Sequence, residues 1–103
     1  MTMLFILTMV PKGKSDELSR KIVEEKLAGC SLIVNLQDSK FFWEGKLTHE
    51  KEDLIIFKTL EKNSEKIFKR IKELHPYETP FIGQIKLDKT NTEYENWLRE
   101  VIG

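Results

Sequence analysis

The chain begins with a continuous apolar run that predicts a buried β-strand. Residues 3–10 read Met-Leu-Phe-Ile-Leu-Thr-Met-Val, a stretch of strand length without a charged side chain. A strand that is covered on both faces, at the centre of a sheet, has this pattern. Pro11 and Gly13 then end the predicted strand, because both residue types interrupt strand pairing.

Two helices are predicted from apolar positions that recur with helical spacing. The first is expected to start at Ser15, whose hydroxyl can cap a helix, and to stop at Gly29. The second begins at Asn63 or Ser64 and ends at about His75, since the residue before Pro76 avoids the helical region. Their apolar faces consist of Leu18, Ile22, Val23 and Leu27 in the first helix and Ile67, Phe68, Ile71 and Leu74 in the second.

The segment between the two helices predicts a long β-hairpin. Residues 32–36 and 40–43 form one long or broken strand, and residues 54–59 form the returning strand. Gly45 and the polar stretch 48–53 are expected to form the turn. This hairpin is longer than a small sheet needs, so part of it is expected to pack on something else.

The C-terminal part of the chain predicts a fourth strand and a third helix. Apolar side chains in residues 81–87 indicate the strand. Thr92 and Glu95 form the T-x-x-E pattern of a capping box at the start of the helix. Tyr94 and Trp97 follow at helical spacing and are expected to lie in the core.

The elements therefore follow the order β-α-β-β-α-β-α within a single domain, residues 1–103. Two βαβ halves with right-handed crossovers give an α+β, ferredoxin-like βαββαβ sandwich with an additional C-terminal helix. Its four-stranded antiparallel sheet has both main helices on one face. The other face would expose apolar side chains near Phe41, Trp43 and residues 54–57. Because a soluble protein tolerates such exposure poorly, we expect subunits to associate sheet to sheet.

Composition and charge narrow the classes of partner. The chain has 17 basic and 17 acidic residues, so it lacks the basic excess that supports binding to nucleic acid. No apolar stretch approaches the ~20 residues of a membrane span, and residues 3–10 lack the flanks of a signal peptide. Cys30 is the only cysteine, which suits a reducing, cytoplasmic compartment. We expect neither a nucleic-acid partner nor a membrane partner.

A set of short motifs resembles the CutA family. The motifs are Leu27-Ala-Gly-Cys30, Trp43-Glu-Gly45, Lys58-Thr59, His75-Pro-Tyr77 with Pro80, and Tyr94-x-x-Trp97. They run in the family order across essentially the whole chain. The resemblance implies a ferredoxin-like subunit in a tight homotrimer, a cytosolic or organellar location, and a link to tolerance of copper and other divalent cations. It also implies an architecture similar to the PII signalling trimers, which bind small ligands between subunits.

The candidate metal ligands are Cys30 and His75. A copper or zinc site needs several converging nitrogen or sulfur ligands, and no C-x-x-C or H-x-x-x-H spacing occurs. A divalent cation would therefore have to bind between Cys30 and His75 of neighbouring subunits. The alternative is that Cys30 is a small buried apolar residue. Phe81 stands where the family usually has the acidic member of its intersubunit cleft, which weakens the metal hypothesis.

The candidate ligand-binding residues of such a cleft are Trp43, Lys58, His75 and Tyr77. The proline-stiffened segment of His75 and Tyr77 either borders the cleft or simply ends a helix. Lys58 either binds an anion or covers apolar surface with its stem. Trp43 either stacks on a planar ligand or packs in a subunit interface. The acidic side chains in residues 50–53 are expected to form a solvated turn rather than a cation site.

These observations favour a non-enzymatic binding or scaffold homotrimer whose clefts take a metal ion or a small ligand. A PII-like signalling trimer without a metal is one alternative. A small enzyme with His75 as acid–base and Lys58 for charge stabilisation is a weaker one, because no nucleophile or carboxylate base is assured and no catalytic residue is assigned. A purely structural trimer without any ligand site is a further alternative.

Overall fold

A four-stranded antiparallel sheet in the order β2-β5-β1-β6 organises the computed structural model, which describes residues 2–103. The strands are β1 (Met3–Pro11), β2 (Cys30–Asn35), β3 (Ser39–Trp43), β4 (Lys46–Glu50), β5 (Glu52–Leu60) and β6 (Ile82–Lys86). The helices are α1 (Ser15–Glu24), the 3-10 turn η1 (Glu61–Asn63), α2 (Ser64–Leu74) and α3 (Thr92–Ile102). No helix among the described residues is long and apolar enough to cross a membrane. The predicted α+β class and four-stranded sheet are confirmed.

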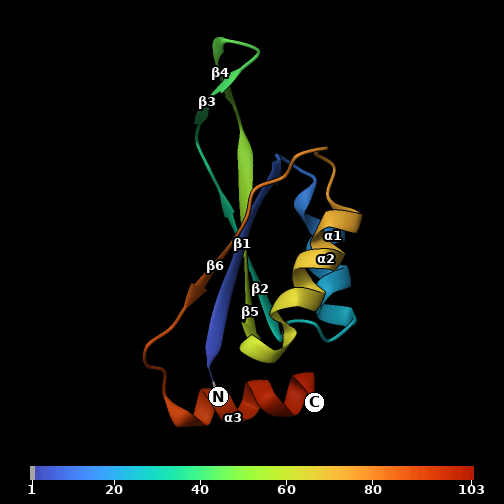
Figure 1. The fold of residues 1–103 in the computed structure, drawn as a ribbon, viewed down its shortest axis with the longest axis vertical. Coiled ribbons are helices and arrows are strands. Elements are labelled where there is room, and N and C mark those ends of the chain that lie inside the picture. The colour runs from blue at the N-terminus through green and yellow to red at the C-terminus, as the bar shows by residue number, and fades with distance from the viewer. Residues whose placement is uncertain (1) are drawn as a thin grey trace.

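Helices α1 and α2 lie side by side on one face of the sheet and form the main core with it (Figure 1). Leu4, Ile6 and Val10 of β1 point into this core and are fully buried. The intervening Phe5 and Leu7 are only half-buried. Within the single chain β1 is therefore covered on one face only, because both helices pack on the same face, and coverage of its other face by a neighbouring subunit stays a prediction.

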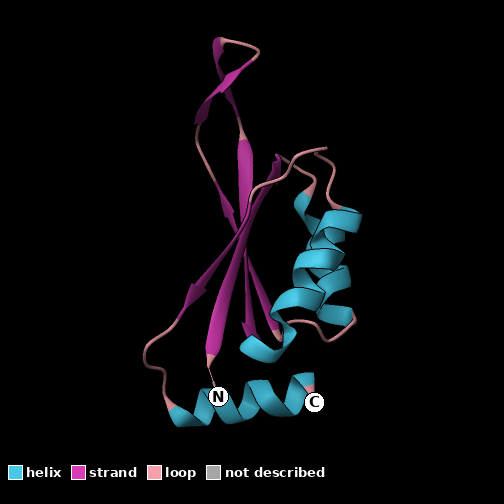
Figure 2. Cartoon of the chain, viewed as in Figure 1, coloured by secondary structure: helices cyan, strands magenta, loops and turns pink. Residues whose placement is uncertain are grey.

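Strands β3 and β4 form an arm (residues 36–51) that extends beyond the main sheet (Figure 2). Its two-residue turn is Glu44-Gly45, with φ angles of 51° and 77°. Positive φ at both turn positions matches the right-handed twist of the flanking strands. The stretch 48–53, predicted to be the turn, lies mostly in β4 and β5 instead, because the chain has already reversed at Glu44-Gly45.

Helix α1 is shorter than predicted, and Ser15 does not cap it. The helix ends at Glu24, and Lys26 adopts a φ of 60°, so Leu27 lies in the connection to β2. Ser15 is the first helical residue, and its hydroxyl donates to the Asp53 carboxylate at 3.3 Å. A contact with a distant strand thus takes the place of a local cap. Helix α2, in contrast, has the predicted bounds.

Helix α3 lies across one end of the sheet (Figure 1). Leu98 is fully buried in a small cluster with Met3 and Leu60. Trp97 is 43% exposed, so its predicted core position is wrong, while Tyr94 is half-buried against the same cluster. The helix contacts the sheet along a narrow stripe centred on Leu98, which leaves the neighbouring indole at the surface.

The predicted capping box at the start of α3 does not form. Asn91 is the N-cap residue, and no side chain caps the first turn. The Glu95 carboxylate instead accepts a hydrogen bond from the Thr90 hydroxyl. The carboxylate that a capping box would direct to the first turn of α3 is therefore bonded to the preceding loop instead.

Candidate functional site

The sheet face opposite the helices is apolar and uncovered within the chain; we call it the open face. Strand registers place one side chain of every two on this face. Its apolar members are Phe5, Leu7, Met9, Leu32, Val34, Leu54, Ile56 and Ile85, together with Phe81, the residue before β6, whose ring lies next to Gly83. The side chains of Leu32 and Val34 are 42% and 43% exposed, and those of Phe81 and Ile85 are 55% and 48% exposed.

Phe81, the residue that departs from the CutA pattern, lies over Gly83 on the open face. An ideal Cβ at Gly83 would be 2.6 Å from the Cζ atom of Phe81, so the phenyl ring fills the space that a side chain would take. The Phe81 carbonyl accepts a hydrogen bond of 2.7 Å from the Thr8 hydroxyl. The start of β6 is thus anchored to β1, and its surface is apolar.

His75 ends α2 as predicted and is buried against β1. Its Nε2 atom lies 2.8 Å from the Met9 carbonyl and 3.0 Å from the Thr8 hydroxyl. The backbone N–H of Tyr77 donates to Nδ1 at 3.0 Å. The hydrogen-bond network therefore assigns a neutral ring that is protonated on Nε2. Burial lowers the pKa of His75, and the Met9 carbonyl and the charge of Glu52 oppose this shift.

Tyr77 connects the His75 segment to β5. Its hydroxyl donates to Oε2 of Glu52 at 2.7 Å, and its ring lies 5.2 Å from the imidazole of His75. Burial raises the pKa of Tyr77, and the hydrogen bond and charge of Glu52 raise it further. Tyr77 is consequently a neutral hydrogen-bond donor at physiological pH.

Asp53 is 2% exposed and accepts three hydrogen bonds from two parts of the chain, the start of α1 and the end of β2. The donors are Asn35 Nδ2 at 2.8 Å, Gly13 N at 3.2 Å and the Ser15 hydroxyl at 3.3 Å. The hydrogen bond from Asn35 is the main reason that the pKa of Asp53 is lowered. Glu52 is also buried, so the prediction that residues 50–53 form a solvated acidic turn is wrong for these two residues.

Lys58 lies on the open face next to α3. Cys30, which is half-buried, is its partner across the β2–β5 pair. The Lys58 ammonium group lies 3.3 Å from the Tyr94 hydroxyl and 4.8 Å from the centre of the Tyr94 ring. This lysine therefore combines a hydrogen bond with a cation–π contact, and its charge remains on the open face.

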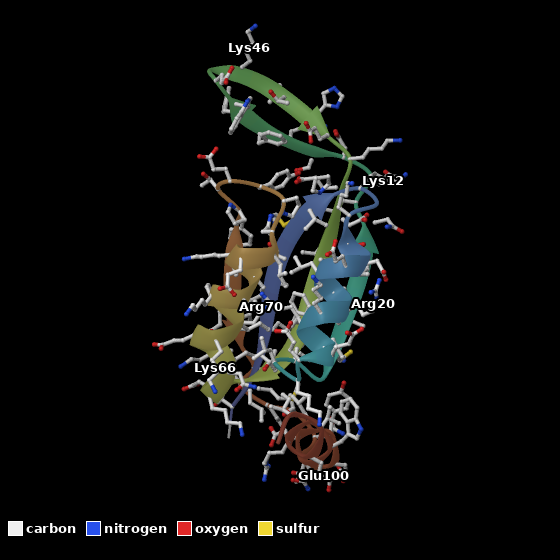
Figure 3. The ribbon with its side chains drawn as sticks, turned by 90° about the vertical axis from the view of Figure 1, so that its right-hand side faces the viewer. Lys12, Arg20, Lys46, Lys66, Arg70 and Glu100 are labelled. Atoms are coloured by element: carbon white, nitrogen blue, oxygen red, sulfur yellow. The ribbon has the colours of Figure 1, made fainter. Side chains whose placement is uncertain are left out.

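The structure places the five predicted site residues in three separate regions of one chain. Glu52, the partner of Tyr77, and Lys58 are six positions apart on β5, a separation of ~20 Å along a strand. His75 and Tyr77 therefore lie near one end of the sheet and Cys30 near the other. Trp43 is 63% exposed on the arm. Figure 3 shows the arm, with Lys46 at its tip, and α3, with Glu100, at opposite ends of the molecule.

Cys30 and His75 do not form a metal site within one chain. They lie at different ends of the sheet, and both ring nitrogens of His75 already have hydrogen-bond partners. No group of three or more His, Cys, Asp or Glu side chains in residues 2–103 is arranged to hold a metal ion. Any cation site that uses Cys30 and His75 needs residues from more than one subunit.

Sequence reasoning missed the roles of Thr8, Glu52 and Asp53. The alternation in β5 offered one signal, because Asp53 shares its parity with the core residues Ile55 and Phe57. A carboxylate in such a position is expected to be buried and paired. The partner of Glu52 had no comparable signal, since Tyr77 is distant in sequence.

Comparison with known proteins agrees with this architecture. Residues 3–101 match the family described as CutA1 divalent ion tolerance protein. The divalent-cation tolerance protein CutA of Pyrococcus horikoshii is 39% identical over 101 residues, covering 95% of this chain and 96% of the relative. That of Thermotoga maritima is 36% identical over 101 residues, with 97% and 99% covered.

Solved structures show the same fold. The divalent cation tolerance protein (Cut A1) of Thermus thermophilus has a TM-score of 0.90 and 34% identity, covering 98% of this chain and 99% of that one. CutA from Synechococcus elongatus has a TM-score of 0.95 and 25% identity, with 99% and 91% covered. The predicted resemblance and the ferredoxin-like fold are confirmed, and the chain belongs to the CutA1 divalent ion tolerance protein family.

Proposed function

We propose that the chain works as a non-enzymatic homotrimer in the tolerance of divalent cations, with clefts between its subunits that take a small ligand or a metal ion. The observation that carries the proposal is the open face, a sheet surface with apolar side chains from all four strands and no helix covering it. The names of the relatives, divalent-cation tolerance proteins, support the cellular role.

Burial of the open face against other copies accounts for its composition. Monomeric proteins rarely expose contiguous apolar patches larger than a few hundred Å². Strands β2 and β6 are also the two edge strands of the main sheet. The unpaired backbone N–H and C=O groups of an edge strand can form hydrogen bonds with a strand of another chain. A closed ring of subunits would bury the open faces and pair the edge strand β2 or β6 of each subunit with its neighbour. The simplest such ring repeats one contact between two different surfaces of the subunit.

The proposed cleft brings together residues that one chain keeps apart. Lys58 offers a positive charge for an anionic group, and Trp43 and Tyr77 offer aromatic surfaces. We favour a small ligand over copper or zinc as the occupant of the cleft. His75 has to lose a backbone hydrogen bond before one of its ring nitrogens can bind a metal. The same contacts oppose an enzyme that uses His75 as acid–base.

Cellular location is part of the proposal, and we place the chain in the cytoplasm. Cys30 is the only cysteine, so no disulfide within the chain favours an oxidising compartment. The solved CutA of Archaeoglobus fulgidus carries the word periplasmic in its name. Fractionation of the source cells decides between the two compartments: recovery of the protein in the periplasmic fraction would contradict our assignment.

Sedimentation equilibrium tests the assembly. The expected mass is three times the 12.2 kDa of the chain, and a monomer at micromolar concentration contradicts the proposal.

Calorimetric titration with Cu²⁺, Zn²⁺ and small anions then tests the cleft. Loss of Cu²⁺ or Zn²⁺ binding in Cys30→Ser supports a shared metal site, whereas unchanged binding excludes Cys30. Loss of anion binding in Lys58→Gln supports a ligand cleft, whereas unchanged binding excludes Lys58.

A further inference from the structure

Where the arm continues into β5, the first two residues of that strand are Glu52 and Asp53. Side chains alternate along a strand, so Asp53 lies on the helix-covered face of β5 and Glu52 on the opposite side. Both carboxylates are buried, with exposures of 7% for Glu52 and 2% for Asp53. The base of the arm is therefore held from two sides by charged groups.

The contacts of Asp53 come from segments that belong to the body. Its donors are Gly13 and Ser15 at the start of α1 and Asn35 at the end of β2. A backbone hydrogen bond of 3.2 Å from Lys12 N to the Lys51 carbonyl adds a further tie at the same place. Hydrogen bonds from α1, β2 and the segment between β1 and α1 therefore hold this side of the arm base.

The other side is held from segment 75–81, which continues directly into the edge strand β6. The Tyr77 hydroxyl donates to Glu52 Oε2 at 2.7 Å. Segment 75–81 is itself attached to β1, through His75 at one end and the Phe81 carbonyl at the other. Tyr77 thus connects a loop that leads to the edge of the sheet with the base of an arm on the far side of β1.

We propose that the Tyr77–Glu52 hydrogen bond couples segment 75–81 to the arm, so that displacement of Tyr77 by a ligand or a neighbouring subunit loosens the arm. The inference rests on the proposed function, in which segment 75–81 borders the cleft and the arm takes part in assembly. Loss of Tyr77 leaves Glu52 as a buried carboxylate without this donor, which favours movement of Glu52 toward water.

The coupling has to act in both directions. If displacement of Tyr77 loosens the arm, an arm held by a neighbouring subunit must stabilise Tyr77 in its contact with Glu52 by the same factor. Assembly and occupancy of the cleft are then linked through Tyr77, in addition to any contact that Trp43 of the arm makes with the ligand. Tyr77 is in this sense a positioning residue.

Hydrogen exchange on the full chain tests the coupling. In Tyr77→Phe, which removes only the hydroxyl, amides in residues 46–51 should exchange about tenfold faster than in the wild type, as expected for loss of one hydrogen bond to a charged acceptor. Tyr94→Phe is the matched control, because its hydroxyl is bonded to Lys58 near the opposite end of the sheet. Arm exchange in Tyr94→Phe should equal that of the wild type.

Variants at Glu52 separate the hydrogen bond from the charge. Glu52→Gln keeps an oxygen that accepts from Tyr77 and should retain most of the protection, whereas Glu52→Leu should match Tyr77→Phe. Unchanged arm exchange in Tyr77→Phe, or an equal increase in Tyr94→Phe, would overturn the proposal.

Failure of the coupling can be told apart from failure of the proposed function. Sedimentation of the wild type reports on the trimer alone. If the wild type is a monomer, the proposed function fails while the exchange comparison still reports on the coupling. If the wild type is a trimer and the arm of Tyr77→Phe exchanges normally, only the coupling fails.

Discussion

Asp53 and His75 are buried titratable residues whose hydrogen bonds join segments that are distant in the sequence. Asp53 joins the start of α1, the end of β2 and the base of the arm. His75 joins the end of α2 to β1 and shapes the turn that carries Tyr77. Each is a titratable group held in one protonation state by its neighbours, so each makes stability depend on its partners and on pH.

Asp53→Ala should lower the free energy of unfolding by about 3 kcal/mol. The substitution removes a charged acceptor and leaves the donors of Gly13, Ser15 and Asn35 without it. Urea unfolding followed by circular dichroism measures the change. Asp88→Ala removes an exposed carboxylate and serves as the control. A loss in Asp53→Ala no larger than that in the control contradicts the role assigned to Asp53.

His75 should make the protein less stable as the pH falls. Its pKa in the folded chain is lowered by burial, so the unfolded chain, with a pKa of about 6.5, binds the proton more readily. The contribution of the neutral ring is fully present above that pH. It is lost as the pH falls through about 6.5 toward the lowered pKa of the folded state.

Urea midpoints measured from about pH 8 to about pH 5 test this prediction, because carboxylates titrate mainly below that range. The wild type should lose stability over the lower part of the range, and His75→Gln should not. His49→Gln, which changes an exposed histidine on the arm, should behave like the wild type. The same decline in His75→Gln as in the wild type would exclude His75 as its cause.

At the scale of elements, α3 and the arm are attached in different ways. The arm continues two strands of the main sheet and is held at its base by polar contacts. Helix α3 is joined to the sheet by the loop after β6 and depends on apolar packing around Leu98. That packing needs a small residue opposite, because an ideal Cβ at Gly29 would lie 2.3 Å from Leu98 Cδ1.

Gly29→Ala should therefore destabilise the protein through Leu98. We expect a cost of about 1–2 kcal/mol for the overpacked site and about 2–4 kcal/mol for Leu98→Ala alone. In the Leu98→Ala background, the added methyl group at Gly29 has room and should cost little. A double-mutant cycle in urea measures this interaction. Additive effects would show that the two residues do not compete for the same space.

For the whole molecule, the decisive feature is its one-sided construction. The chain measures 46 × 25 × 21 Å, with α1 and α2 on one face of the sheet and the arm continuing the long axis (Figure 1). A monomer of this shape leaves the open face in water, which the hydrophobic effect disfavours. One chain therefore forms a buried core on the helix side of its sheet but leaves the apolar open face uncovered.

Ile85→Glu should shift the protein toward smaller species in sedimentation. Ile85 is 48% exposed on the open face, so a charge there is solvated in the monomer but buried in the proposed trimer. Gln84→Glu is the control, because Gln84 lies on the opposite face of β6, where it contacts Ser64. Equal masses for Ile85→Glu and the wild type would show that the open face around Ile85 is not an interface.

The sequence predicted the class of fold well, but it did not predict how the candidate site residues are arranged in the chain. Periodic apolar positions located α2 and the strands of the main sheet, and short motifs identified the family. The acidic residues of β5 were misplaced, because the predicted turn extended from Gly45 to Asp53, whereas the chain reverses at Glu44-Gly45. The roles of the candidate site residues stay predictions, and their distribution over three regions of one chain was not foreseen.

By itself, the sequence determined the order of elements, the sheet class and the end of α2 at His75. These features depend on local properties, namely hydrophobic period and the conformational restriction before Pro76. Only the tertiary structure decided that Asp53 holds Ser15, that Leu98 rather than Trp97 enters the core, and that both nitrogens of His75 are occupied. These contacts join segments far apart in the chain, so they exist only once the sheet and helices have packed.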